Sequence, residues 1–129
     1  MAIATRLASQ GWHVFAGVSS DNDAAKLHNR HRQISPFHLD VTKQGEIRDA
    51  DRMVGVRLGG ETFSGLVNNA GIAEMGPLTV QPLDEIRAHF EVKVFGAIAT
   101  CQAFPPLLGQ DRSRHGAPVR IVNITSLGG

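Results

Sequence analysis

The 129-residue sequence contains no tyrosine, one tryptophan and one cysteine. The lone cysteine, Cys101, excludes an internal disulfide, which fits a reducing compartment, and we expect the protein in the cytoplasm. An excess of one charge is also missing, because 13 Lys and Arg stand against 12 Asp and Glu with no basic block. This balance predicts no nucleic-acid or anionic-membrane partner and favours a small, weakly charged molecule.

Long hydrophobic runs are absent too. The most apolar stretch, residues 94–108, contains Thr100, Gln102 and two prolines, and it is shorter than the roughly 20 residues that span a bilayer. We expect no membrane span and no secretory signal. His28 and His31 could share a helix face, but no carboxylate or cysteine completes a ligand set, so we expect no metal site.

The hydrophobic pattern alternates between strand-like and helix-like segments. With 42% hydrophobic residues, the chain can form one domain over residues 1–129. We expect Thr42 to cap the helix that ends at Gly59, and Pro82 to begin one long helix through Phe104. Such alternation is typical of an α/β fold with a parallel sheet. The expected strands are 13–18, 34–39, 63–67 and 119–124.

Small or polar residues follow each expected strand. In open parallel sheets, ligands bind just beyond the carboxyl ends of the strands, so these positions form a candidate ligand site. Taken singly, each of them could equally be an ordinary turn or helix cap. The positions are Ser19-Ser20, Asp40-Val41, 68–71 and Thr125-Ser126.

Four segments resemble short-chain dehydrogenases/reductases, in the order that this family has them. Residues 66–72 (LVNNAGI) are similar to its Asn-Asn-Ala-Gly signature, and residues 38–42 (HLDVT) to its adenine-contacting segment. Residues 90–96 (FEVKVFG) and 120–129 (RIVNITSLGG) match its long helix and the strand that carries its catalytic serine. The resemblance covers essentially the whole chain, about half of a family domain. It implies a Rossmann-type doubly wound parallel sheet.

The resemblance also implies a site for NAD or NADP. Asp40 would accept a hydrogen bond from the adenine amino group, and the Val41 amide would meet a ring nitrogen. Residues 69–71, which are Asn69, Ala70 and Gly71, would let the backbone approach the cofactor ribose. Ser19 ends the strand whose last residues select NAD or NADP in this family, but it is neither a carboxylate nor an arginine, so the choice stays open. Asn68 would instead tie neighbouring strands together.

Two further positions are implied in catalysis. Ser126 would hydrogen-bond the substrate oxygen whose charge changes during hydride transfer; the alternative is a strand-end serine that caps the next turn. Lys93 occupies the position of an asparagine that kinks the family's long helix and supports a proton-relay water. Since a lysine cannot accept a hydrogen bond, either the relay depends on the backbone carbonyl at this position or it is compromised.

Two elements of the family pattern are not in the sequence. One is the opening strand with its glycine-rich turn, which presents helix amides to the pyrophosphate. The other is the Tyr-x-x-x-Lys pair beyond Ser126, without which we expect the chain to be nearly inert. In the sheet order 3-2-1-4-5, the first strand would lie between strands 13–18 and 63–67. We therefore expect an open cleft there or a non-native pairing of those two strands.

The resemblance implies a short-chain NAD(P)-dependent oxidoreductase. Hydride would pass between nicotinamide and a small-molecule carbonyl or secondary alcohol. The contexts at residues 14–18 and 71–73 are similar to family members that act on steroids or retinoids. The alternatives are a non-catalytic remnant that binds or dimerises through its long apolar helix, or a gene fragment that does not fold. In the full-length family member we expect a homo-oligomer.

Overall fold

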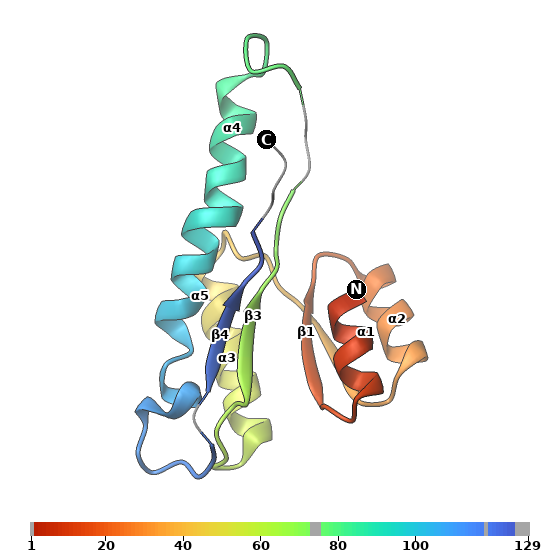
Figure 1. The fold of residues 1–129 in the computed structure, drawn as a ribbon, viewed down its shortest axis with the longest axis vertical. Coiled ribbons are helices and arrows are strands. Elements are labelled where there is room, and N and C mark those ends of the chain that lie inside the picture. The colour runs from red at the N-terminus through yellow and green to blue at the C-terminus, as the bar shows by residue number, and fades with distance from the viewer. Residues whose placement is uncertain (1, 73–75, 118, 126–129) are drawn as a thin grey trace. The chain divides into compact units, whose positions relative to one another are not determined.

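A computed structural model describes residues 2–72, 76–117 and 119–125 of the chain. Helices and parallel strands alternate along these residues, as the sequence pattern predicts (Figure 1). The chain forms two compact units, Met1–Asp40 and Val41–Gly129.

The first unit consists of two parallel strands and two helices. They are α1 (Ala2–Ser9), β1 (Val14–Val18), α2 (Asp21–Arg30) and β2 (Ile34–His38). Strands β1 and β2 pair from Val14 opposite Ile34 to Val18 opposite His38. Both helices contact both strands, because their apolar faces cover the same small core. The buried core residues are Ala8, Ala16, Val18, Leu27 and Ile34.

Local signals fix where the helices of this unit begin and end. Gly11 follows α1 with a φ of 89°, a left-handed conformation that glycine adopts without steric cost. Ser20 caps α2, since its hydroxyl oxygen accepts a hydrogen bond from the Asp23 amide at 3.2 Å. Asp21 and Asp23 lie in the first turn of α2, where a carboxylate favours the positive end of the helix dipole.

The second unit begins with α3 (Gln44–Leu58) and the parallel strands β3 (Gly65–Asn68) and β4 (Arg120–Asn123). The strands pair from Gly65 opposite Arg120 to Asn68 opposite Asn123. Between them the chain forms α4 (Leu83–Phe90), the π-helical segment η1 (Glu91–Gly96), α5 (Ala97–Ala103) and a second π-helical turn, η2 (Pro106–Gln110). Helices α3 and α5 pack against each other. Figure 1 shows α4, η1 and α5 as one continuous column.

Three sequence predictions about this unit are corrected. The expected single long helix contains η1, where the α-helical hydrogen-bond pattern is replaced by the wider π pattern. Pro82 is the residue before α4 rather than its first residue. The residue at the N-cap of α3 is Lys43, which makes no side-chain capping bond, so Thr42 is not the cap.

The strand pairing tests one of the two expectations about the sheet, the non-native pairing of strands 13–18 and 63–67. Within the described ranges, β1 pairs only with β2 and β3 only with β4. The non-native pairing of β1 with β3 therefore does not occur. The two pairings are those that the order 3-2-1-4-5 requires of its outer strands, so the incomplete Rossmann-type parallel sheet is confirmed.

Candidate functional site

In the first unit, Ser19 and Asp40 follow the carboxyl ends of neighbouring strands. The ladder between β1 and β2 extends one residue past β2, because the Leu39 amide donates to the Val18 carbonyl oxygen at 2.9 Å. Ser19 and Asp40 therefore leave the same edge of this sheet, as their sequence positions predicted. Ser19 is exposed and Asp40 is half-buried.

In the second unit, Asn68 ties the ends of β3 and β4 together. Its carbonyl oxygen accepts a hydrogen bond from the Ile124 amide at 2.9 Å. Its side-chain amide nitrogen Nδ2 donates to Asn123 Oδ1, also at 2.9 Å. The interpretation of Asn68 as a tie between strands is thus confirmed, whereas the next three residues remain free for a ligand.

The turn that follows β3 is open to a ligand. Asn69, Ala70 and Gly71 are all exposed. A side chain that the sequence singled out separately, Lys93 of η1, lies against Gly71. A Cβ atom built on Gly71 would overlap Lys93 Cε and Nζ, so the lysine chain passes directly over the glycine. A larger residue here would have to displace the flexible end of the Lys93 side chain.

Lys93 brings a positive charge to the turn. Within the part of the chain that the structure describes, its ammonium group makes no ion pair with a carboxylate. An ammonium group has three donors and no acceptor. Lys93 can therefore hold a water or a ligand oxygen near Gly71 only by donating hydrogen bonds to it.

Val41 contacts η1 through a second glycine, Gly96. A Cβ atom on Gly96 would lie 2.6 Å from Val41 Cγ2, 3.0 Å from its Cβ and 3.2 Å from its carbonyl oxygen. The segment η1 thus contacts two of the predicted cofactor-binding residues, Val41 through Gly96 at its end and Gly71 through Lys93 in its middle. The sequence pointed to Lys93 by family resemblance, but it gave no sign that Gly96 supports Val41.

Ser126 lies outside the described residues. Strand β4 ends at Asn123, three positions earlier in the sequence, and residues 124 and 125 extend from it. The predicted role of Ser126 therefore stays a prediction.

Two carboxyl groups among the described residues of the second unit have shifted pKa values, and both lie in loops or helices rather than at the strand ends. Burial raises the pKa of Asp51 on α3, and the Arg114 guanidinium partly opposes this effect. Hydrogen bonds from the Ser113 hydroxyl and amide lower the pKa of Asp111. Across residues 2–72, 76–117 and 119–125, no three or more metal-ligating side chains gather into a cluster.

Each unit carries one of the predicted cofactor-contacting segments at a strand end. In the first unit this segment includes the half-buried carboxylate of Asp40, and in the second unit it is the exposed turn 69–71. The sequence has no glycine-rich turn that links a strand to a helix for the pyrophosphate. No described helix is both long and apolar enough to cross a bilayer.

Comparison with known proteins gives consistent matches. Residues 1–129 match the model of the family described as short chain dehydrogenase. Estradiol 17-beta-dehydrogenase 2 of Mus musculus is 31% identical over 132 residues, which covers 98% of this chain and 33% of that protein. Retinol dehydrogenase 5 of Mus musculus is 33% identical over 129 residues, which covers 97% of this chain and 38% of that protein.

A solved structure, the NADPH-bound carbonyl reductase from chicken fatty liver, is 29% identical. It superposes with a TM-score of 0.68 over 77% of this chain and 41% of its own chain. The present chain spans less than half the length of the two mouse relatives.

Proposed function

Because the chain belongs to the short-chain dehydrogenase family, we propose that it supplies the adenosine- and ribose-binding part of an NAD(P)-dependent oxidoreductase. The observation that carries this proposal is the arrangement at the end of β3. The side chain and the carbonyl oxygen of Asn68 are hydrogen-bonded to Asn123 and Ile124, while residues 69–71 stay exposed beside it. A turn that is fixed at its base and open on its surface is suited to backbone contact with a ligand.

Each residue has a distinct part in this proposal. Asp40 accepts a hydrogen bond from the adenine amino group, and the Val41 amide meets the ring. Ser19 lines the same strand edge as Asp40, and residues 69–71 lie against the ribose. A bound nicotinamide would supply or accept the hydride, and the Ser126 hydroxyl would donate a hydrogen bond to the substrate oxygen. Ordering these groups before reaction lowers the barrier, because no solvent has to reorganise around the developing charge.

The proposed substrate is a small apolar carbonyl or secondary alcohol of the steroid or retinoid kind. The names of the two mouse relatives, an estradiol dehydrogenase and a retinol dehydrogenase, support this class. The NADPH in the carbonyl reductase structure supports a nicotinamide cofactor without deciding between NAD and NADP. We further propose a cytoplasmic location.

The test is titration of the purified chain with NADH and NADPH, following nucleotide fluorescence and thermal unfolding. We expect saturable binding that raises the unfolding temperature, as mass action requires of a ligand that binds only the folded state. In Asp40→Ala the dissociation constant should rise about 10- to 100-fold, the effect of losing a hydrogen bond to a charged group.

Asp49→Ala is the matched control for this titration. Asp49 is an exposed carboxylate of α3 that pairs with Arg52 at 2.8 Å, and its loss should leave nucleotide binding unchanged. Equal affinities of the two variants would contradict the assignment of Asp40. Absence of binding by the unsubstituted chain would contradict the cofactor role of this chain.

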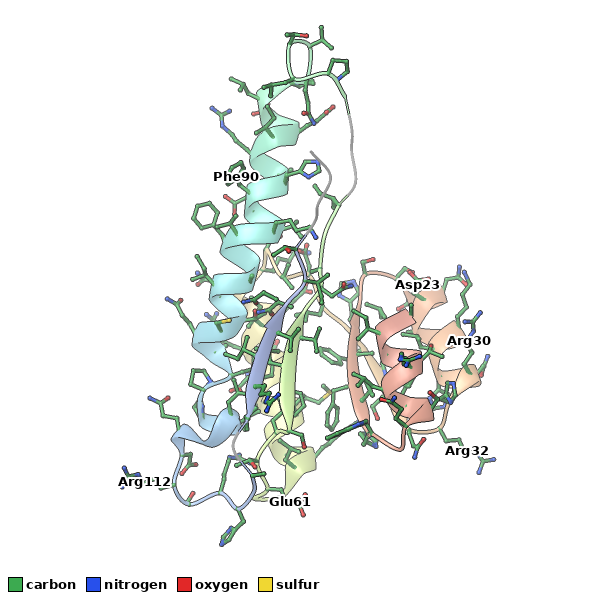
Figure 2. The ribbon with its side chains drawn as sticks, viewed as in Figure 1. Asp23, Arg30, Arg32, Glu61, Phe90 and Arg112 are labelled. Atoms are coloured by element: carbon green, nitrogen blue, oxygen red, sulfur yellow. The ribbon has the colours of Figure 1, made fainter. Side chains whose placement is uncertain are left out.

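A second candidate function is self-association through the helical column. Five large apolar side chains of α4, η1 and α5 are exposed within the described residues: Leu83, Phe90, Val94, Phe95 and Ile98. In Figure 2, Phe90 points away from β3 and β4. An exposed apolar stripe of this size is typical of an interface.

Sedimentation measurements test this candidate. Phe95→Glu should shift a dimer towards monomer, whereas Val56→Glu, at an exposed apolar position on α3, should not. A monomer that binds neither nucleotide would contradict both candidate functions.

A further inference from the structure

Thr100 of α5 is the one buried polar residue among the described residues. Its hydroxyl oxygen lies 2.7 Å from Asn68 Oδ1, 2.9 Å from the Ala97 carbonyl oxygen and 3.1 Å from the Gly96 carbonyl oxygen. A hydroxyl has one proton to donate, and all three of these atoms can only accept. The shortest contact, with Asn68, takes the main share of that proton.

This bond and the contact with Asn123 together favour one orientation of the Asn68 carboxamide. With Oδ1 directed at Thr100, the Nδ2 group faces Asn123 Oδ1 at 2.9 Å and Cys101 Sγ at 3.3 Å. Rotating the carboxamide by half a turn would place its NH₂ group against the Thr100 hydroxyl and its oxygen against Asn123 Oδ1. The first of these contacts would remove the closest acceptor of the Thr100 hydroxyl, and the second would join two acceptors, so Thr100 and Asn123 together favour the observed orientation.

The result is a chain of side-chain hydrogen bonds from helix α5 through β3 to β4. Asn68 is the residue from which the turn 69–71 leaves β3. Asn123 is the last residue of β4 and precedes Ser126 by three positions. We propose that Thr100 is a positioning residue, which sets the turn 69–71 and the end of β4 in register with each other. This inference rests on the proposed function, because these two segments matter only if they bind the cofactor and carry the reactive serine.

Two substitutions distinguish the effect of the Thr100 hydroxyl from the effect of the side chain's shape. Thr100→Val keeps the branched shape but leaves Asn68 Oδ1 without its donor in a partly buried place. Thr100→Ser keeps the hydroxyl and loses only a methyl group. We expect the dissociation constant for NADH or NADPH to rise about 5- to 20-fold in Thr100→Val, the consequence of an unpaired acceptor. In Thr100→Ser it should stay within about twofold of the unsubstituted chain.

A third variant controls for general loss of stability. Val54 is a fully buried core residue of α3, and Val54→Ala should lower the unfolding temperature without touching the hydrogen-bonded chain. All affinities are measured well below the unfolding temperature of each variant. A merely structural Thr100 would behave like Val54, with reduced stability and unchanged affinity.

A second measurement does not depend on nucleotide binding. In the two-dimensional amide NMR spectrum of the free chain, the side-chain NH₂ signals of Asn68 and Asn123 should both shift in Thr100→Val and return in Thr100→Ser. Unchanged Asn123 signals, or a Thr100→Ser variant that binds as poorly as Thr100→Val, would overturn the inference. If the unsubstituted chain binds neither nucleotide, the proposed function fails, and the amide signals alone decide whether Thr100 positions these strands.

Discussion

Replacing Gly96 by alanine should destabilise the second unit, although alanine is the better helix former. Gly96 has helical dihedral angles, φ −61° and ψ −43°, so the backbone itself would favour alanine by about 1 kcal/mol. Against this gain stand three contacts of the new Cβ with Val41, at 2.6, 3.0 and 3.2 Å. The last is with a backbone oxygen, which cannot move by rotating a side chain.

The net effect follows from these two terms. Overpacking of this kind costs about 1–3 kcal/mol, so the free energy of unfolding should fall by about 1 kcal/mol. For a chain of this length that corresponds to a decrease of roughly 3–5 °C in the unfolding temperature. Far-UV circular dichroism is the appropriate probe, because the only tryptophan, Trp12, lies in the first unit.

Gly45→Ala is the matched control. Gly45 lies in the first turn of α3, and a Cβ atom there would have no neighbour within 4 Å. The same substitution should therefore stabilise the chain, by up to about 1 kcal/mol. A double variant, Gly96→Ala with Val41→Ala, removes the closest contact and should recover part of the loss. If Gly96→Ala is as stable as Gly45→Ala, the contact between Val41 and η1 is not as the structure describes it.

Three further predictions concern groups away from the strand ends. Burial raises the pKa of Asp51 despite Arg114, so its ionised form disfavours folding. Asp51→Asn should increase the free energy of unfolding in urea at about pH 7, by less than about 1 kcal/mol. The gain should shrink as the pH falls towards about 4, and a loss at neutral pH would mean that the attraction to Arg114 dominates. Ser113→Ala removes the 2.7 Å hydroxyl bond to Asp111. In an NMR titration of this variant, the lowered pKa of Asp111 should move up towards its ordinary value. The stabilisation by ionised Asp111 should then be lost at a higher pH than in the unsubstituted chain. An unchanged pKa would assign the shift to the hydrogen bond from the Ser113 amide. Thr5 Oγ1 is buried without a hydrogen-bond partner in the described structure, so Thr5→Val should leave stability unchanged or raise it by up to about 1 kcal/mol, and calorimetric destabilisation would contradict this.

The elements that sequence reasoning located correctly have strong local signals. Strand β1 is a short apolar run after Gly11, and α3 has apolar residues at helical spacing that end at Gly59, which has a φ of 58°. The π segment η1 has no such signal, because an apolar stripe at helical spacing runs through it unbroken. Thr42 is a good capping residue by type, but α3 begins one residue too late for it, at Gln44.

The candidate site was predictable only as far as neighbouring strand ends could be inferred from chain order. This reasoning placed Ser19 beside Asp40 and Asn68 beside the end of β4. It could not find Thr100, since a polar residue inside an apolar helix stripe does not reveal its partner, which is 32 positions away in sequence.

Three residues of η1 and α5 contact segments that the sequence linked to the cofactor. Gly96 closes η1 and packs on Val41, Lys93 in its middle covers Gly71, and Thr100 one turn later holds Asn68. Positions 93 and 100 are seven residues apart, a spacing that puts two side chains on the same face of a helix. Thr100→Val should therefore break only the contact with Asn68 and leave Lys93 over Gly71. Lys93→Met supplies the converse case, because it keeps the chain over Gly71 and removes only the ammonium group. Its Asn68 side-chain amide signals should match those of the unsubstituted chain, and a shift as large as that in Thr100→Val would mean that the two contacts are not independent.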